Sequence, residues 1–118
     1  MFKKFLLLAS AGLMAIGPAV AAEKVKIGFV TTITTPAGVI GKDMVDAVNL
    51  AMEDIGSKMA GLDVELIVED DGFKPAIGKQ KTDKLVKQDK VQFVTGFIWS
   101  HVLLASQKSA LGAGKFLI

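Results

Sequence analysis

The stretch "VKIGFVTTITTPAGVIGKDMVDAVNLAMEDI", residues 25–55, decides the fold because its hydrophobic period changes once along its length. Residues 25–31 form an apolar run of the kind that is buried on both faces in parallel sheets. From residue 38 onward the apolar side chains recur at helical spacing, with charged and polar side chains on the other faces. The stretch therefore predicts a buried strand and then an amphipathic helix over 38–55. The apolar face of that helix is formed by Met44, Val48, Ala51, Met52 and Ile55.

The same alternation of strand and helix continues to the end of the chain. Further elements are predicted at 63–70 (strand), 76–89 (helix), 91–97 (strand), 101–112 (helix) and 115–118 (strand). Pro75 suits the first position of the second helix, because its missing N–H would have no partner there. The order β-α-β-α-β-α-β predicts an α/β fold with a parallel sheet and helices on both faces. The last strand breaks off at residue 118, so we expect the first part of a longer protein.

The first 21 residues have the layout of a secretory signal peptide. Two lysines precede an apolar run over 5–17, and the small residues Ala19-Val20-Ala21 follow it. The run is too short to cross a bilayer, which takes about 20 residues. We expect cleavage after Ala21, with Ala22 as the alternative. No Cys is present for disulfides or lipidation, so the sequence predicts a soluble periplasmic protein whose mature part begins at residue 22.

The charge balance argues against a nucleic-acid or anionic-membrane partner. The 14 basic residues of the chain are all lysines, and two of them belong to the predicted leader. Without the leader, the remaining 12 lysines equal the 12 acidic residues, so the mature chain is formally neutral. The absence of Arg also leaves no guanidinium fork to hold a carboxylate or phosphate.

The candidate binding site lies in the loops that follow the first and third predicted strands, because parallel sheets bind ligands outside the carboxyl ends of their strands. The first loop, "TTITTPAGVIG" (31–41), is rich in hydroxyls and includes Thr34 and Pro36. The second, "GFIWSH" (96–101), places Ser100 at the expected N-cap of a helix. A ligand carboxylate could bind there to the hydroxyl and the first N–H groups. The alternative is a Ser that only caps its own helix.

Trp99 and His101, the only Trp and the only His, flank this Ser. Trp99 offers a flat apolar face with one N–H donor, suited to a pocket wall, and the alternative is a packing residue. His101 is a possible donor to an anion, although a His at a helix start is more often a capping or surface residue. Ser100 and His101 are helix neighbours that diverge in direction, and the G-x-S-x-G elbow is missing, so we predict no enzyme.

The other constellations do not indicate a metal or a cofactor. A single His without any Cys cannot supply the usual ligands of a metal site. Asp70 and Asp71 could chelate Mg²⁺, but "DDG" is typical of a polar turn whose Asp accepts from backbone N–H groups. The glycines spell neither a dinucleotide fingerprint nor a phosphate loop. We therefore predict that the protein needs no cofactor and no metal.

Three stretches together resemble the start of the branched-chain amino-acid type of periplasmic substrate-binding protein. They are residues 25–55, "LDVELIVEDDGFKPAIGKQKTDKLVKQDKVQFVTG" (62–96) and "FIWSHVLLA" (97–105). The likeness covers residues 25–118. Its most telling features are the strand-loop-helix opening with Pro36 and Gly41, "VEDD" followed by Pro75, and a strand ending in Gly96 before a Ser-bearing helix start.

The resemblance implies a type I periplasmic binding protein of which residues 22–118 form part of the N-terminal lobe. Such a protein is a monomer that closes two lobes over a small carboxylate and delivers it to the permease of an ABC importer. By resemblance, Ser100 holds the ligand carboxylate. Beside it the likeness places Ile98, Trp99 and His101, and in the first loop Thr34, Pro36 and Ile40. Ile40 corresponds to a pocket position that is often Tyr in amino-acid binders.

Two departures from the family pattern bear on the ligand. Members often carry a disulfide between the turn after the second strand and the loop after the third, where this chain has Phe73 and Trp99. Ile40 and Trp99 also make the predicted wall more apolar than an ammonium group requires, and "GFIWS" resembles binders of lignin-type aromatic acids. The ligand is thus expected to be an amino acid or an aromatic carboxylate. A ligand-sensing domain of a receptor with the same fold is the alternative function.

Overall fold

The structure is a computed structural model that describes residues 23–118, so the predicted signal peptide, residues 1–21, lies outside the described residues. Its elements in chain order are β1 (Val25–Thr31), α1 (Gly38–Asp54), β2 (Lys58–Met59), β3 (Leu62–Asp70), α2 (Pro75–Lys84), the π-helical turn η1 (Leu85–Asp89), β4 (Phe93–Thr95), α3 (Ser100–Gly112) and β5 (Phe116–Leu117). No helix of the described part has the length and apolar character needed to cross a membrane.

The strands form a single sheet in the order β2-β3-β1-β4-β5. β1 is parallel to β3, in a register that runs from Val25–Val64 to Thr31–Asp70, and it is also parallel to β4. β5 extends the sheet in parallel beside β4, and only β2 is antiparallel, to β3. The predicted α/β fold with a mostly parallel sheet is therefore confirmed.

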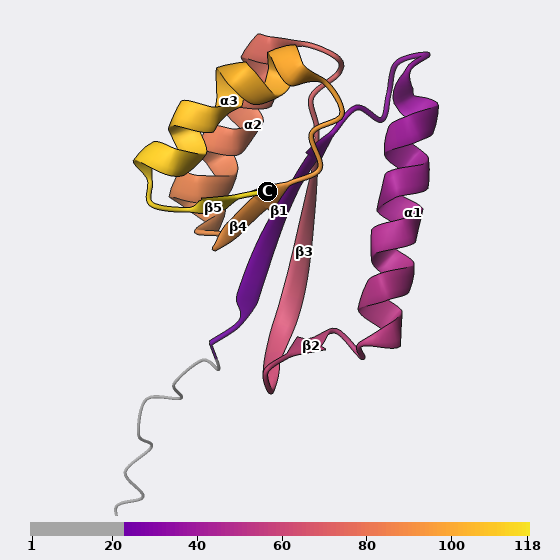
Figure 1. Cartoon of the computed structure of the whole chain (residues 1–118), viewed down its shortest axis with the longest axis vertical. Coiled ribbons are helices and arrows are strands. Elements are labelled where there is room, and N and C mark those ends of the chain that lie inside the picture. Colours follow the sequence, from indigo (N-terminus) through magenta and orange to yellow (C-terminus); the bar gives the residue numbers. More distant parts are fainter. Residues whose placement is uncertain (1–22) are drawn as a thin grey trace, which may run out of the picture.

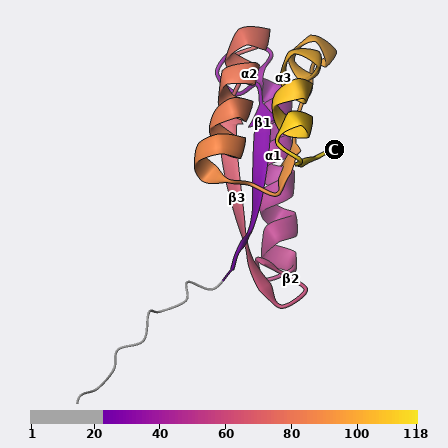
Figure 2. The same cartoon turned by 90° about the vertical axis from the view of Figure 1, so that its left-hand side faces the viewer.

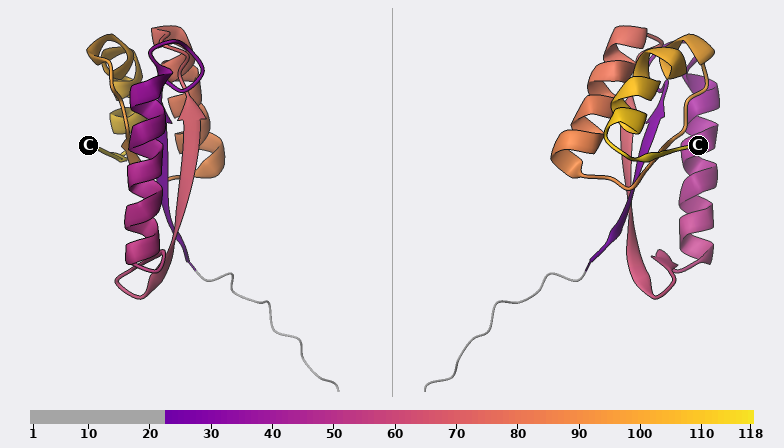
Figure 3. Two further views of the ribbon diagram at one scale, coloured as in Figure 1. Left: turned by 90° about the vertical axis from the view of Figure 1, so that its right-hand side faces the viewer. Right: turned by 60° about the vertical axis from the view of Figure 1, so that its left-hand side comes forward.

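Helices cover both faces of this sheet, as predicted. Figure 1 shows α1 on one side of the sheet and the pair α2 and α3 on the other, and the views in Figures 2 and 3 agree. Because β1, β3 and β4 run in the same direction, their carboxyl ends lie at one edge of the sheet. The loops to α1, α2 and α3 gather at that edge (Figure 1).

The hydrophobic core lies between the sheet and the α2–α3 pair. Leu85 and Val86, which begin η1 at the end of the second helix, are buried in it. Its other buried members are Val30, Val91, Val94 and Ala110. The face of α1 is less completely covered: Met44, Val48 and Met52 are half-buried, and the fully buried residues of this helix are glycines.

One predicted element changes its helix type along its length, and another is shorter than the hydrophobic pattern indicates. The helix predicted over 76–89 ends as an α-helix at Lys84 and continues as η1, which stops where Lys90 turns to a left-handed φ of 57°. The strand predicted over 91–97 is shortened to β4, because Gly96 adopts a φ of 97°. A Cβ atom on Gly96 would lie 2.9 Å from the ring of Phe29, so the chain can turn here only with glycine.

The sequence pattern did not predict β2. It forms a short hairpin with the start of β3, in which Lys58 pairs with Asp63 at 2.5 Å and Ala60 takes a φ of 50°. A left-handed Ala is an unusual turn residue, so the hairpin signal of Asn-Gly or Asp-Gly is missing.

Candidate functional site

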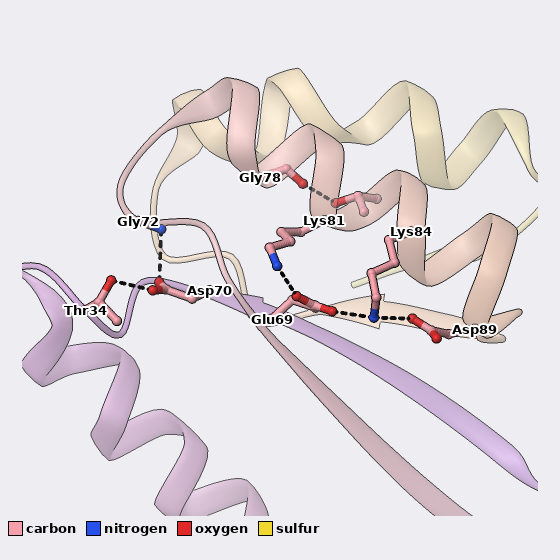
Figure 4. A network of polar contacts seen from close by, with 9 residues as sticks. Thr34, Glu69, Asp70, Gly72, Gly78, Lys81, Lys84 and Asp89 are labelled. Atoms are coloured by element: carbon pink, nitrogen blue, oxygen red, sulfur yellow. Dashed lines mark hydrogen bonds and ion pairs between the residues drawn. The ribbon is translucent and has the colours of Figure 1, made fainter.

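The loop after β1 is fixed to the end of β3 by the carboxylate of Asp70. Asp70 Oδ1 accepts from the N–H of Ile33 at 2.9 Å and from the N–H of Gly72 at 3.0 Å, and Oδ2 accepts from the Thr34 hydroxyl at 2.5 Å (Figure 4). Burial favours a higher pKa for Asp70, but these hydrogen bonds outweigh it and lower the pKa below its ordinary value. Asp70 is therefore ionised at neutral pH and acts as the turn residue that the sequence indicated.

Three predicted site residues of the first loop and first helix lie exposed at this edge. Thr34 and Pro36 are exposed loop residues, and the Thr34 hydroxyl is already engaged by Asp70. Ile40, which the family likeness places with the first loop, lies in the first turn of α1, and 49% of it is exposed. The helix begins at Gly38, as the hydrophobic period predicts, and Gly38 and Gly41 let it rest directly on the backbone of residues 32 and 33.

A second buried carboxylate joins all three loops. Asp71 and Thr32 are fully buried, and the Thr32 hydroxyl donates to Asp71 Oδ1. The same hydroxyl accepts from Trp99 Nε1 at 3.0 Å, and Asp71 Oδ1 also accepts from the N–H of Phe73 at 2.8 Å. The indole N–H of Trp99 is therefore used inside the protein, and only the ring of this residue remains for a ligand.

An aromatic cluster lies over this network and consists of Phe73, Trp99 and His101. The ring centroids of Phe73 and Trp99 are 4.8 Å apart in an edge-to-face arrangement, and those of Phe73 and His101 are 5.1 Å apart. Phe73 and Trp99 are the positions at which the family resemblance places a disulfide. In this chain the turn after β3 and the loop after β4 meet through aromatic rings.

The predicted N-cap of the third helix is wrong by one residue. α3 begins at Ser100, the N-cap position is occupied by Trp99, and no side-chain hydrogen bond caps the helix. The Trp99 carbonyl accepts instead from the N–H groups of Val102 and Leu103, each at 3.0 Å. The N–H groups of Ser100 and His101 have no intrahelical acceptor and lie beside the exposed Ser100 side chain. Ile98 is half-buried before them.

Sequence reasoning missed how three residues organise the edge: it did not single out Thr32, and it named Asp71 and Phe73 without their contacts to Thr32 and to the aromatic rings. Each was visible as part of a pattern, the first as the residue after β1 and the others within the "DDGF" turn. The convergence of loops at the carboxyl edge could have pointed to them. Which loop residues contact one another, however, depends on the register Thr31–Asp70, which the sequence alone does not define.

Three hollows of the described surface lie away from this edge. Open hollows of about 280 and 340 Å³ lie along α2 and between α2 and α3, and one of about 380 Å³ lies near Val25 and Phe116 at the opposite end of the sheet. Among residues 23–118, no group of three His, Asp or Glu side chains could hold a metal ion. The loop edge is therefore an open face that carries an aromatic cluster and the N-terminus of α3.

A protein-family model of the periplasmic binding proteins matches residues 24–118. Since this match covers nearly all of the described chain, the protein belongs to the periplasmic binding protein family. No curated protein matches the sequence.

The solved structures that this chain resembles belong to the same class, the substrate-binding proteins of transporters. An ABC transporter substrate-binding protein from Sphaerobacter thermophilus has 29% identity and a TM-score of 0.76, with 80% of this chain and 26% of that chain covered. The branched-chain amino acid transporter substrate-binding protein LivJ from Streptococcus pneumoniae, in complex with isoleucine, has 27% identity and a TM-score of 0.76, with 80% and 28% covered. A solute-binding protein of an ABC transporter from Rhodopseudomonas palustris BisB5, in complex with 3,4-dihydroxybenzoic acid, has 28% identity and a TM-score of 0.77, with 80% and 26% covered.

These alignments show how much of a whole substrate-binding protein this chain corresponds to. The chain spans about a quarter of the length of the substrate-binding proteins that it resembles. The matched proteins include one in complex with isoleucine and one in complex with 3,4-dihydroxybenzoic acid.

Proposed function

We propose that the protein is the periplasmic solute-binding component of an ABC importer. Its partners are a small carboxylate ligand and the permease subunits of the transporter, and it carries out no chemistry on the ligand. Residues 1–21 direct export and are removed, and residues 22–118 contribute part of the N-terminal lobe of a monomeric two-lobe protein. Family membership and the relatives of known class support this role.

The observation that carries the proposal is the N-terminus of α3 at the loop edge. The N–H groups of Ser100 and His101 and the positive end of the helix dipole can bind an anionic group, and the Ser100 hydroxyl adds a donor without any Arg. Trp99 supplies an apolar wall next to that position. A carboxylate attached to a small apolar body fits this arrangement.

Binding in this scheme uses the loop edge as one half of the site. The other half belongs to a second lobe, and the ligand stabilises the closed state because it contacts both lobes only there. The exposed rim on the α1 side is formed by Thr34, Pro36 and Ile40. The rim on the α3 side is formed by Ile98, Trp99, Ser100 and His101. A face of this kind needs no cavity of its own in a single lobe.

The test is a thermal-shift screen of the full-length protein, followed by calorimetry. Isoleucine, benzoate and 3,4-dihydroxybenzoate are the carboxylate probes, and methyl benzoate is the control that lacks the negative charge. We expect at least one carboxylate to raise the melting temperature and methyl benzoate to leave it unchanged. Failure of small carboxylates to bind would contradict the proposal. A membrane-spanning helix after the second lobe would favour the receptor sensor instead.

A further inference from the structure

A relay of hydrogen bonds connects the aromatic ring of Trp99 to the buried carboxylate of Asp71. Trp99 Nε1 donates to Thr32 Oγ1 at 3.0 Å, and Thr32 Oγ1 donates onward to Asp71 Oδ1. A hydroxyl can accept and donate at once, so Thr32 satisfies both partners. Because Thr32 and Asp71 are fully buried, water does not compete for these bonds.

The same carboxylate fixes the second ring of the cluster. Asp71 Oδ1 accepts from the Phe73 N–H at 2.8 Å, and Phe73 adopts a φ of 65°. A left-handed backbone is uncommon for a bulky residue and requires support from its surroundings. Here it places the Phe73 ring edge-to-face with Trp99 and His101, at interplanar angles of 88° and 82°. Phe73 remains 44% exposed at the loop edge.

We propose, building on the proposed function, that Thr32 and Asp71 are positioning residues that select a ligand with a flat aromatic body. They direct the indole N–H of Trp99 inward, so that the rings of Trp99 and Phe73 rather than a hydrogen-bond donor border the carboxylate position at Ser100. Aromatic groups pack well against such edges and faces. An aromatic carboxylate such as benzoate is therefore preferred to an amino acid such as isoleucine.

The positioning is tested by hydrogen exchange of the Trp99 indole N–H in the ¹⁵N-labelled full-length protein, with the resonance assigned by its loss in Trp99→Phe. We expect slow exchange in the wild type and an acceleration of at least about tenfold in Thr32→Val, which lacks the acceptor. Thr32→Ser keeps the hydroxyl and should restore slow exchange. Thr82→Val is the matched control, because Thr82 is equally buried but bonds to the Gly78 carbonyl at 2.8 Å.

Ligand selection is tested on the same variants with benzoate and isoleucine. We expect the wild type to prefer benzoate, Thr32→Val to lose at least about tenfold in benzoate affinity, and Thr32→Ser and Thr82→Val to retain it. Unprotected exchange in the wild type would overturn the positioning even if Thr32→Val does not fold. A preference for isoleucine would overturn the selection of aromatic acids while leaving solute binding intact. Absence of binding by both probes and by other small carboxylates would contradict the proposed function itself, and the exchange experiment would still decide the role of Thr32.

Discussion

Ser100 is the first residue of α3 and not its cap, and this distinction changes what its hydroxyl can do. A capping Ser is bound to its own helix, whereas an exposed Ser at the first helical position points its hydroxyl to the same region as the first N–H groups. This side chain does not cap the helix. Its removal should therefore weaken ligand binding more than it lowers the stability of the fold.

In the full-length protein, Ser100→Ala should weaken carboxylate binding by about 1–3 kcal/mol, the usual cost of a hydrogen bond to a charged group. The free energy of unfolding should change by less than about 0.5 kcal/mol. Calorimetric titration and urea unfolding measure the two quantities. Ser109→Ala, more than two turns further along α3, is the control that should leave affinity unchanged. Unchanged affinity in Ser100→Ala would remove Ser100 from the site.

Gly41 sets how closely α1 approaches the first loop. A Cβ atom at this position would lie 1.8 Å from the Thr32 carbonyl oxygen, and a backbone atom cannot move aside as a flexible side chain does. Gly41→Ala should therefore destabilise the protein by about 1–3 kcal/mol. Gly112→Ala is the control, because its Cβ meets open space, and it should be neutral or stabilising by up to about 1 kcal/mol. Urea unfolding of the two variants checks the contrast.

At the residue level, the helical pattern predicted burial correctly at the end of the second helix and only in part on α1, where Ala51 and Ile55 of the predicted apolar face are exposed. The prediction failed for side chains in loops. Leu85 and Val86 follow the helical period, so their burial could be predicted. The contacts of Thr32, Asp71 and Phe73 arise from strand register and from a left-handed backbone at Phe73, and neither leaves a periodic signal. Trp99 as a pocket wall stays a prediction, and the internal use of its N–H was not predicted from the sequence.

At the scale of elements, ion pairs between side chains attach α2 to the sheet, in addition to its apolar residues. Glu69 on β3 accepts from Lys81 at 2.7 Å and from Lys84 at 2.6 Å, and Lys84 also contacts Asp89 at 3.0 Å (Figure 4). Burial of Glu69 favours a higher pKa, but the two lysine hydrogen bonds outweigh it and lower the pKa. The charges that the sequence placed on a solvated face thus also connect helix to strand.

Asp83 on α2 provides a pH-dependent contribution to stability. Hydrogen bonds from Lys79 and Lys87 lower the pKa of Asp83 from 3.8 to about 2. A lowered folded-state pKa means that the stabilisation is complete above about pH 4 and is lost as the pH falls toward 2.

Asp83→Asn should therefore lower the free energy of unfolding by about 0.5–1 kcal/mol at pH 7, as expected for two exposed i,i+4 ion pairs. The difference in unfolding free energy between the variant and the wild type should shrink as the pH falls from about 4 to about 2. Urea midpoints across this range provide the measurement. Asp46→Asn, an exposed change on α1 outside these ion pairs, is the control. A cost that is independent of pH would exclude the ionic explanation.

The boundaries of elements were predicted less well than their existence, for local physical reasons. Pro75 begins α2 as expected, because proline is suited to the first helical turn. α2 changes to a π-turn at Leu85 without any breaker in the sequence, and β4 stops at Thr95 because Gly96 turns the chain. β2 was missed because its turn uses a left-handed Ala.

For the whole molecule, the alternating pattern was sufficient to predict a parallel sheet covered on both faces. It did not predict how incompletely α1 and the β5 edge are covered. Large apolar side chains remain exposed there, among them Val39 (66%), Leu50 (61%), Phe116 (67%) and Ile118 (78%). Contiguous exposed apolar surface on a soluble protein marks a contact face or a site of association.

Residues 23–118 produced alone should consequently bind a hydrophobic dye such as ANS and self-associate. The full-length protein should bind less dye and remain monomeric. Dye fluorescence and light scattering at matched concentrations compare the two. Replacing Leu50 and Phe116 by Lys should reduce the association of the short chain. A monodisperse short chain that does not bind the dye would contradict the prediction.

The central position of β1 also governs when the chain can fold. β1 emerges first, yet both of its neighbours come later, and the Lys26 N–H reaches Gln92 across 66 residues. Pairing at such sequence distance is slow, because the entropy of closing long loops must be overcome before the contacts form. In the export that we propose for this protein, the delay would keep β1 unpaired until β3 and β4 have been synthesised, so the chain would still be unfolded when it reaches the membrane.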